Sequence, residues 1–446
     1  MFLQFIPDKQ YELWGYWQRL GTQDKMVAAY QAALTQYEKA SVKANLSYEQ
    51  NQLASFFYTV GYYPASEPLF QRALAISEQV LGAQHPDTAT SLNNLAGLLY
   101  HKGDYDGAEP LYQRALAISE QVLGAQHPST AISLGNLAGL LENKGNYDDA
   151  EPLRRRALAI HEQVLGAQHP DTATSLNNLA GLLRNRGDYD GAEPLYRRAL
   201  AIYEQVLGAQ HPLTATSLNN LAFLLEKKGD YDGAEPLFQR ALAIHEKVLG
   251  AQHPDTATSL NNLAGLLYHK GDYDGAEPLF QRALAIREQV LGAQHPDTAT
   301  SLNNLAGLLY HKGDYDGAEP LFQRALAIHE QVLGAQHPET AASLNNLAEL
   351  LRKKGDYDGA EPLYQRALAI SEQVLGAQHP STAISLNNLA GLLEDQGDYE
   401  GAEPLFQRAL LIAEQVLGHE HPNTVIFRNN LASLINLKSH SSTANY

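Results

Sequence analysis

One pattern dominates this chain of 446 residues: a block of 42 residues recurs many times without an insertion or a deletion. The copy at residues 85–126 reads HPDTATSLNNLAGLLYHKGDYDGAEPLYQRALAISEQVLGAQ. A fixed period of this length predicts a solenoid, in which each unit buries its apolar face only against its neighbours. The opening histidines of the copies are His85, His127, His169, His211, His253, His295, His337, His379 and His421.

Each block predicts two helices, which we call A and B. Pro86 suits the first turn of helix A, because a missing N–H is tolerated there, and apolar residues recur at helical spacing until Gly103. Asp106, followed three residues later by Glu109, resembles a capping box, so helix B is expected to begin there and to end before Gly124. The repeating unit is therefore predicted to be a helical hairpin, and the fold an all-α solenoid.

Four parts are expected along the chain. Residues 1–43 predict a degenerate N-terminal helical cap, and residues 44–421 predict nine tandem repeats. Residues 422–438 predict a last helix A that has no helix B to follow it and caps the array. Residues 439–446 are polar and predict a disordered tail.

Charge and composition narrow the classes of partner. Acidic residues outnumber basic ones by 50 to 32, which gives a formal net charge of −18 and argues against nucleic acid, since a phosphate-binding surface needs a basic stripe. The chain has no cysteine, so a disulfide framework is excluded. No apolar run approaches the ~18 residues of a membrane span, and no secretory signal opens the sequence. We expect a cytoplasmic protein with neither nucleic-acid nor membrane partners.

The residues also argue against catalysis. Histidines one unit apart should be separated by roughly 8 to 10 Å, which is too far for shared metal coordination, so loop and capping roles are expected for them. The chain carries neither a phosphate-binding GxxxxGK[ST] loop nor a GxSxG elbow. We expect no enzymatic activity, no cofactor and no metal.

A family resemblance rests on one set of positions in the hairpin. The motif Leu95-Ala96, Gly103-Asp104-Tyr105, Ala108, Tyr112 and Ala115-Leu116 resembles the tetratricopeptide repeat (TPR). The 42-residue spacing with Leu-Gly-x-x-His-Pro-x-Thr resembles the kinesin light chain variety, and the near-identical copies are most similar to its bacterial members. The resemblance covers about residues 44 to 438.

The resemblance implies a right-handed superhelix without enzymatic activity, in which the A helices line a concave groove that holds peptides or partner proteins. Two departures matter. Residues 1–43 lack the heptad coiled coil that holds the motor in kinesin light chains, so a motor partner is not expected. The groove surface carries mixed charges, whereas the family's cargo groove is basic where it receives acidic peptides.

The candidate ligand contacts lie on the side of helix A opposite its leucine stripe. Asparagine is a mediocre helix former, so the second residue of the Asn-Asn pair needs a reason for recurring in every copy. An amide donates and accepts hydrogen bonds and therefore suits a peptide backbone. The resemblance implies that these asparagines form a ladder along a bound peptide, and hydrogen bonding between successive A helices is an equally good explanation. They are Asn94, Asn136, Asn178, Asn220, Asn262, Asn304, Asn346, Asn388 and Asn430.

Specificity would come from residues of the same surface that differ between copies, although a solvated helix surface also explains any single one. Gly97 and its copies indicate either a close approach of the A helices or a groove floor kept open for a ligand. The further candidate contacts are Asn177, Asn219, Asn261, Tyr100, His101, Arg184, Phe223, Lys227, Tyr268, Tyr310 and Arg352.

The leading hypothesis is a scaffold that binds a protein or peptide in this groove. A second is a structural solenoid, monomeric or weakly self-associating end to end through its unpaired final helix. A third is the sensing arm of a larger bacterial signalling system with an NTPase or protease-like effector.

Overall fold

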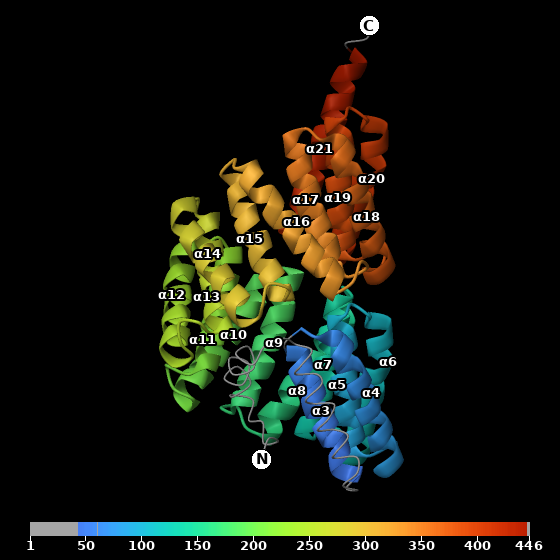
Figure 1. Ribbon diagram of the computed structural model, residues 1–446, viewed down its shortest axis with the longest axis vertical. Helices are drawn as coiled ribbons and strands as arrows, with labels where there is room; N and C mark the ends of the chain where they lie inside the picture. The colour runs from blue at the N-terminus through green and yellow to red at the C-terminus, as the bar shows by residue number, and fades with distance from the viewer. Residues whose placement is uncertain (1–42, 60, 444–446) are drawn as a thin grey trace.

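The computed structural model describes residues 43–59 and 61–443 (Figure 1). Within these ranges there are nineteen α-helices and two short π-helical segments, and no strand. This confirms the predicted all-α solenoid. The predicted N-terminal cap lies outside the described residues apart from Lys43.

The helices alternate between the two members of each hairpin. The A helices are α3 (Lys43–Thr59), α5 (Pro86–His101), α7 (Pro128–Asn143), α9 (Pro170–Arg186), α11 (Pro212–Lys227), α13 (Pro254–His269), α15 (Pro296–His311), α17 (Pro338–Lys354), α19 (Pro380–Asp395) and α21 (Pro422–Thr443). The B helices are α4 (Tyr63–Val80), α6 (Tyr105–Ile118), α8 (Tyr147–Val164), α10 (Tyr189–Val206), α12 (Tyr231–Val248), α14 (Tyr273–Val290), α16 (Tyr315–Val332), α18 (Tyr357–Ile370) and α20 (Tyr399–Val416). Two π-helical segments, η2 (Ser119–Leu123) and η3 (Ser371–Leu375), extend α6 and α18.

The recurring histidine begins helix A. In α5 the ring Nδ1 of His85 accepts a hydrogen bond from the N–H of Asp87 at 3.1 Å, and Pro86 takes the first helical position. The same cap recurs in every copy through that of His421, which receives the N–H of Asn423. The predicted capping role of the histidines is confirmed, because each ring satisfies a donor that would otherwise lack a partner.

Helix B begins earlier than the predicted capping box. The N-cap of α6 is Asp104, whose carboxylate accepts the N–H of Gly107 at 2.9 Å, and the helix begins at Tyr105. The prediction placed the start at Asp106 because Glu109 follows it at the right spacing. A Cβ on Gly107 would collide with the Asp104 carboxylate, so the glycine belongs to the cap.

The core comprises one large cluster that runs from Ala96 to Leu266 across several hairpins, and smaller clusters within and between the other hairpins. Within the α5–α6 hairpin, Leu92 and Ile118 are almost fully buried and meet across small alanines. Each such side chain contributes ~1.5 to 3 kcal/mol on burial. Most contacts therefore join near neighbours in the chain, as a repeat array requires.

The last helix continues beyond its predicted end. We expected α21 to stop at Lys438 and a disordered tail to begin at residue 439, but the helix reaches Thr443. Ser439 occupies the position at which Gly103 ends helix A in the other copies, so no αL residue interrupts the helix. Arg428 replaces the buried leucine of the other A helices and bonds to Glu414 and the His419 carbonyl.

The array coils until its second turn rests on its first. In Figure 1 the helices α17 to α20 lie above α4 to α8. The glycine after helix A of a first-turn unit meets the His-Pro loop that lies 234 residues later. A Cβ on Gly103 would lie only 3.0 Å from Pro338 Cδ and 3.1 Å from His337 Cδ2. The other pairs are Gly61 with His295 and Pro296, Gly145 with His379 and Pro380, and Gly187 with His421.

Burial shows how far this contact extends. Valines at the ends of the B helices in the first turn, from Val80 to Val248, are 39–48% exposed, whereas Val332 and Val374 in the second turn are half-buried. Val332 packs against the aromatic cluster around Tyr63, and Val374 against the cluster that contains Leu141. The same repeat sequence is thus exposed in one turn and covered in the next.

Candidate functional site

Residues of the A helices line two cavities, and we call this surface the A-helix groove. The first cavity, of about 440 Å³, is lined mainly by α7, with residues of α5, α8 and α9, and includes Asn136 and Asn178. The second, of about 340 Å³, is lined mainly by α11, α13 and α15 and includes Asn262 and Asn304. The structure therefore brings four of the candidate asparagines to cavities on this surface.

The first asparagine of each pair joins neighbouring A helices. Asn219 and Asn261 are buried, and their amide nitrogens donate to Ser259 and Ser301 of the next helix A at 3.1 Å. Asn177 accepts a weaker bond from Ser217 at 3.4 Å. The same donation from asparagine to serine recurs at Asn51, Asn93, Asn303 and Asn345.

The serine that receives this amide also bonds to helix B of the preceding unit. Ser343 pairs with His329 Nδ1 at 2.9 Å, and Ser133 pairs with Ser119 at 3.3 Å. In another copy Arg287 takes this place and donates to Ser301. One buried asparagine, one serine and one variable residue of helix B thus join three helices at these interfaces.

In most repeats the side chain of the second asparagine forms no hydrogen bond within the described part of the chain. Asn94 donates to Asn51 at 3.2 Å and Asn430 donates to Asn387 at 2.8 Å, so the ends of the series hydrogen bond between A helices. The other members form no hydrogen bond to the described part of the chain and are half-buried or exposed: Asn136, Asn178, Asn220, Asn262, Asn304, Asn346 and Asn388. Their donors and acceptors remain available on the groove surface.

The repeated glycine of helix A does not mark a close approach of two helices. A Cβ on Gly265 or Gly307 would meet no described atom within 4 Å, although both glycines line the second cavity. At Gly97 the nearest atom is the Tyr112 hydroxyl at 3.5 Å, which is ordinary van der Waals contact. Of the two predicted explanations, the open groove floor agrees with these distances.

The variable residues of the N-terminal half pair with one another along the groove. Tyr100 accepts a hydrogen bond from Asn143 at 2.5 Å, and His101 packs edge-on against Tyr100. Arg184 and Lys227 lie 5.0 and 4.9 Å from the ring centroid of Phe223, which replaces the usual glycine. A phenylalanine between two cations forms cation–π contacts and fills the groove floor at this unit.

The variable residues of the C-terminal half form a similar chain. The Tyr268 ring lies 5.1 Å from that of His311, and the Tyr310 hydroxyl donates to Glu349 at 3.0 Å. Arg352 bonds both Glu349, at 3.2 Å, and Asp395, at 2.6 Å. Contacts between successive units therefore fix the orientation of these side chains.

Sequence reasoning missed an ion pair in the first cavity. Arg154 Nε lies 2.6 Å from Glu142 Oε1, and each side chain is only 12% exposed. Burial raises the pKa of Glu142, and Arg154 partly offsets that rise. The available signal was the coincidence of two departures in one unit, because Gly135 replaces an asparagine and Arg154 replaces an aromatic residue.

The described residues contain no group of three or more His, Cys, Asp or Glu side chains placed to hold a metal ion. None of the helices in these ranges combines the length and apolar character that crossing a membrane requires.

The fold and its surface define a class: an α-solenoid of helical hairpins with a groove formed by one helix of each pair. The chain belongs to the tetratricopeptide repeat family, since the sequence profile of that repeat matches overlapping stretches from residue 44 to residue 440. The matches are residues 44–121, 87–142, 129–205, 174–247, 213–289, 255–316, 297–373, 339–410 and 381–440. Members of this family are typically scaffolds for protein–protein interaction, and they are generally non-catalytic.

The solved structures to which the chain is similar include repeats of the kinesin light chain type. The nearly identical TPR-like repeats of a Podosopora anserina kinesin light chain are 27% identical, over 46% of this chain and 97% of that one, with a TM-score of 0.39. BtubC from P. vanneervenii is 27% identical, over 54% and 93%, with a TM-score of 0.42. A Rap protein complexed with Competence and Sporulation Factor is 17% identical, over 79% and 99%, with a TM-score of 0.47. No curated protein matches the chain significantly.

Proposed function

We propose that this chain is a non-enzymatic scaffold that binds an extended peptide segment of a partner protein in the A-helix groove. The second asparagines of the interior units are the proposed ladder. The observation that carries the proposal is the division of labour within each Asn-Asn pair. The first asparagine is used between helices, whereas the second keeps its amide unengaged beside the cavities.

An extended peptide suits this arrangement for a physical reason. Its backbone presents a donor and an acceptor at every residue, and an amide side chain can pair with either. The carbonyl oxygens of Asn219, Asn261 and Asn303 are buried and have no donor among the described residues. Buried polar atoms normally find a partner. Asn261 and Asn303 line the second cavity, so their oxygens would accept a peptide N–H while their amide nitrogens keep their bonds to serine.

The variable residues would select the side chains of the peptide. The Phe223 ring with its two cations offers an apolar and positively charged contact, while Glu226 beside it is buried and has its pKa raised by that burial. The Arg154–Glu142 pair provides a polar contact in the first cavity. We expect a peptide of mixed character, in accord with the mixed charge of the groove.

The test is selection of peptide binders followed by substitution of the ladder. Peptides selected from a displayed random library would be measured against a variant with Asn178→Ala, Asn220→Ala and Asn262→Ala. We expect at least a tenfold loss of affinity with unchanged helicity. The matched control carries Asn94→Ala and Asn430→Ala, whose amides already donate to neighbours. Equal affinity of the ladder variant and the wild type would refute the ladder.

A further inference from the structure

The contact between the two turns of the coil leaves two edges of the molecule uncovered. One edge carries A–B turns and the other carries His-Pro loops, which are the two halves of that contact. We call them the upper rim and the lower rim. The upper rim consists of the A–B turns of the later units and is marked by the exposed glycines Gly229, Gly271, Gly313, Gly355 and Gly397. The lower rim consists of the B-helix ends and His-Pro loops of the early units and is marked by the exposed valines Val80, Val122, Val164 and Val206.

From this geometry we infer that a second copy of the chain stacks coaxially on the first, with the lower rim of one copy resting on the upper rim of the other. The interface would reproduce between molecules the contact that already exists between turns. It would join A–B turns to His-Pro loops and would not use the final helix α21.

The sequences of the two rims support a second copy as the occupant. The turn at Gly355 repeats that at Gly103, with Gly-Asp-Tyr-Asp-Gly in both, and the turn at Gly103 already receives the loop of His337 and Pro338. The loop at His127 repeats that at His337 as Leu-Gly-Ala-Gln-His-Pro. Each free rim therefore presents one half of a contact whose other half stands on the opposite edge of the same molecule.

Burial supports the same pairing. The glycines that receive a loop within the chain are covered: Gly61 and Gly103 are buried, whereas a Cβ on Gly313 would meet no described atom within 4 Å. The side chain of His85 on the lower rim is 41% exposed, against 9% for His295 in the turn contact. A stacked copy would remove this difference on both edges.

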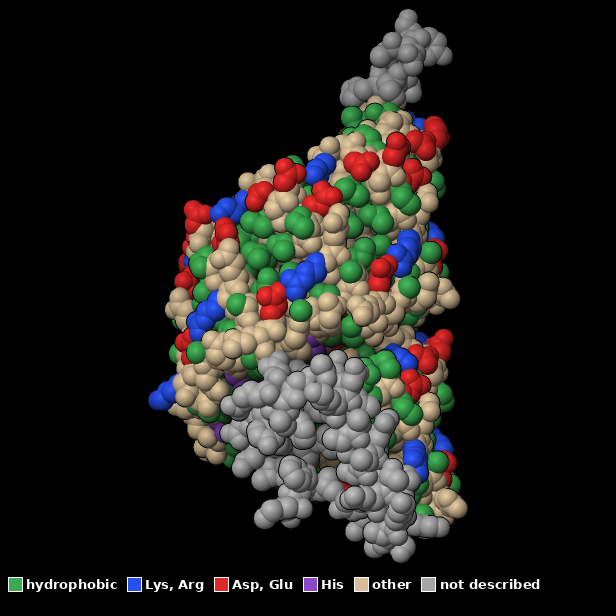
Figure 2. Space-filling model, viewed as in Figure 1, with side chains coloured by type: hydrophobic (Ala, Val, Ile, Leu, Met, Phe, Trp, Pro, Cys, Tyr) green, Lys and Arg blue, Asp and Glu red, His purple; other side chains and the backbone are tan. Residues whose placement is uncertain are grey.

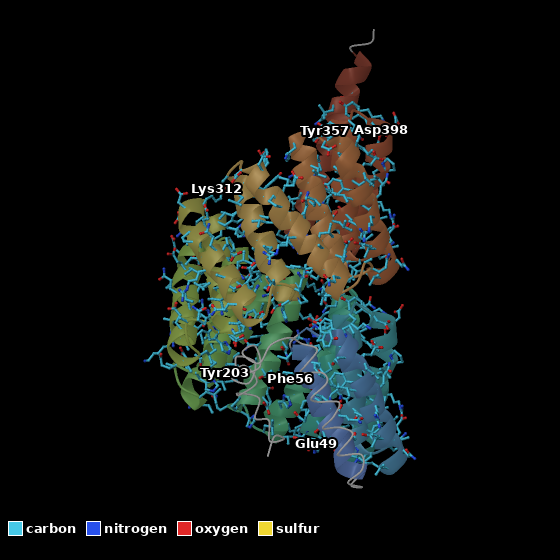
Figure 3. All side chains as sticks on the ribbon, in the orientation of Figure 1. Glu49, Phe56, Tyr203, Lys312, Tyr357 and Asp398 are labelled. Carbon is cyan, nitrogen blue, oxygen red and sulfur yellow. The ribbon has the colours of Figure 1, made fainter. Side chains whose placement is uncertain are left out.

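The charges of the upper rim are those of the turns that already receive a loop within the chain. Lys312 lies 3.0 Å from Asp274 and 2.8 Å from Glu277, and Lys354 pairs in the same way with Asp316 and Glu319. Figure 3 places Lys312, Tyr357 and Asp398 along this edge, and on the face in Figure 2 acidic and basic side chains are interspersed there. The upper rim is net acidic, because a turn such as Asp314, Asp316 and Glu319 carries three acids beside one lysine, Lys354. The turn at Gly103 carries the same acidic residues and nevertheless receives the loop of His337 within the chain.

The proposed contact is heterologous, since it joins two different surfaces. Such an interface leaves a free rim at each end and predicts open growth rather than a closed dimer. It also differs from association through α21, which exposes the apolar residues Val425, Ile426, Ile435 and Leu437 and is not part of the proposed contact.

The test uses two variants that each block one rim. Val122→Glu, Val164→Glu and Val206→Glu place charges on the lower rim, where these valines are exposed and contribute little to folding. Gly313→Asn, Gly355→Asn and Gly397→Asn place side chains on the upper rim, and asparagine tolerates the positive φ of these turns. Circular dichroism would confirm that each variant keeps its helicity.

Sedimentation equilibrium would then be measured for the full chain over a concentration series up to the millimolar range. We expect the weight-average mass of the wild type to rise with concentration and that of each variant to stay at one chain. An equimolar mixture of the two variants should form dimers and nothing larger, because only one pair of rims remains intact. A wild type that stays monomeric throughout would overturn the proposal. So would association that survives in both rim variants and is lost on Ile426→Glu with Ile435→Glu.

Discussion

The Nε2 atom of His337 lies 3.1 Å from the carbonyl oxygen of His101, although 236 residues separate the two in the sequence. The same ring accepts the N–H of Glu339 through Nδ1 and caps α17. One imidazole thus begins a helix and also joins two turns of the coil. For both contacts to form, the ring must be neutral, with its proton on Nε2.

Acidification should therefore open the coil. Burial lowers the pKa of His337 and of His379 to about 4, well below the ordinary value of 6.5. A histidine whose pKa is lowered by a contact stabilises that contact above pH ~6.5 and loses the stabilisation as the pH falls from there toward 4. The sedimentation coefficient should drop over this range at unchanged helicity, because separated turns make the molecule more extended.

A matched pair of variants isolates these histidines. His337→Asn with His379→Asn keeps a good N-cap residue but removes the pH-dependent contact. His127→Asn with His169→Asn changes the same position in the first turn, where these histidines make no contact between turns with the described residues. The pH dependence of the sedimentation coefficient should weaken only in the first variant, and some should remain because burial also lowers the pKa of His295 and His421 in the other two contacts between turns. The same result in both variants would contradict the assignment.

Gly307→Ala should stabilise the fold and weaken peptide binding. Alanine is about 1 kcal/mol better than glycine in a helix interior, and the new methyl group would meet no described atom within 4 Å. That methyl group would project into the second cavity, where we propose that the peptide lies. Thermal denaturation and calorimetric titration measure the two effects. At Gly391 the new Cβ would lie 3.0 Å from Arg352, so Gly391→Ala should stabilise less.

Asp272→Ala should cost about 1 kcal/mol of stability, because the side chain of Asp272 accepts the N–H of Gly275 and caps α14. Asp274 lies two residues away and forms only an exposed ion pair with Lys312, so Asp274→Ala should change stability by less than about 0.5 kcal/mol. Urea denaturation of the two variants compares a cap with a surface ion pair. Equal losses would contradict the cap assignment.

Arg287→His should raise stability by about 1 kcal/mol. The guanidinium is buried, burial lowers its pKa, and its Nε has no partner among the described residues. Neighbouring copies place His245 and His329 at this position, each bonded to the corresponding serine at 2.9 Å. A neutral imidazole would avoid the desolvation of a buried cation. A lower melting temperature for Arg287→His would show that the hydrogen bonds of the guanidinium outweigh that desolvation.

The repeat unit could be predicted from the sequence because its determinants are local. Pro86, Gly103 and the leucine stripe predict the bounds of helix A within one or two residues. The start of helix B was placed two residues late, because both Asp104 and Asp106 are capable caps and only the backbone geometry distinguishes them. The extension of α21 beyond residue 438 follows from Ser439, which stands where a glycine ends helix A in the other copies.

The contact between turns could not be predicted, because it depends on small rotations that accumulate over several units. Nothing in the local sequence distinguishes Gly103, which is buried, from Gly355, which is exposed. The different roles of Asn261 and Asn262 could not be predicted from the sequence for a related reason. Helical periodicity places both on one side of the helix, and only the position of Ser301 decides which amide is used.

The constant offset between Gly103 and Pro338 has a consequence for how such a gene can change. Because every loop is interchangeable with every other, unequal recombination that gains or loses one block leaves the wrapped architecture intact and merely lengthens or shortens it. Neither event would require compensating substitutions elsewhere. Duplication or loss of a block would therefore change the length of ligand that one molecule contacts, and no new substitution would be needed.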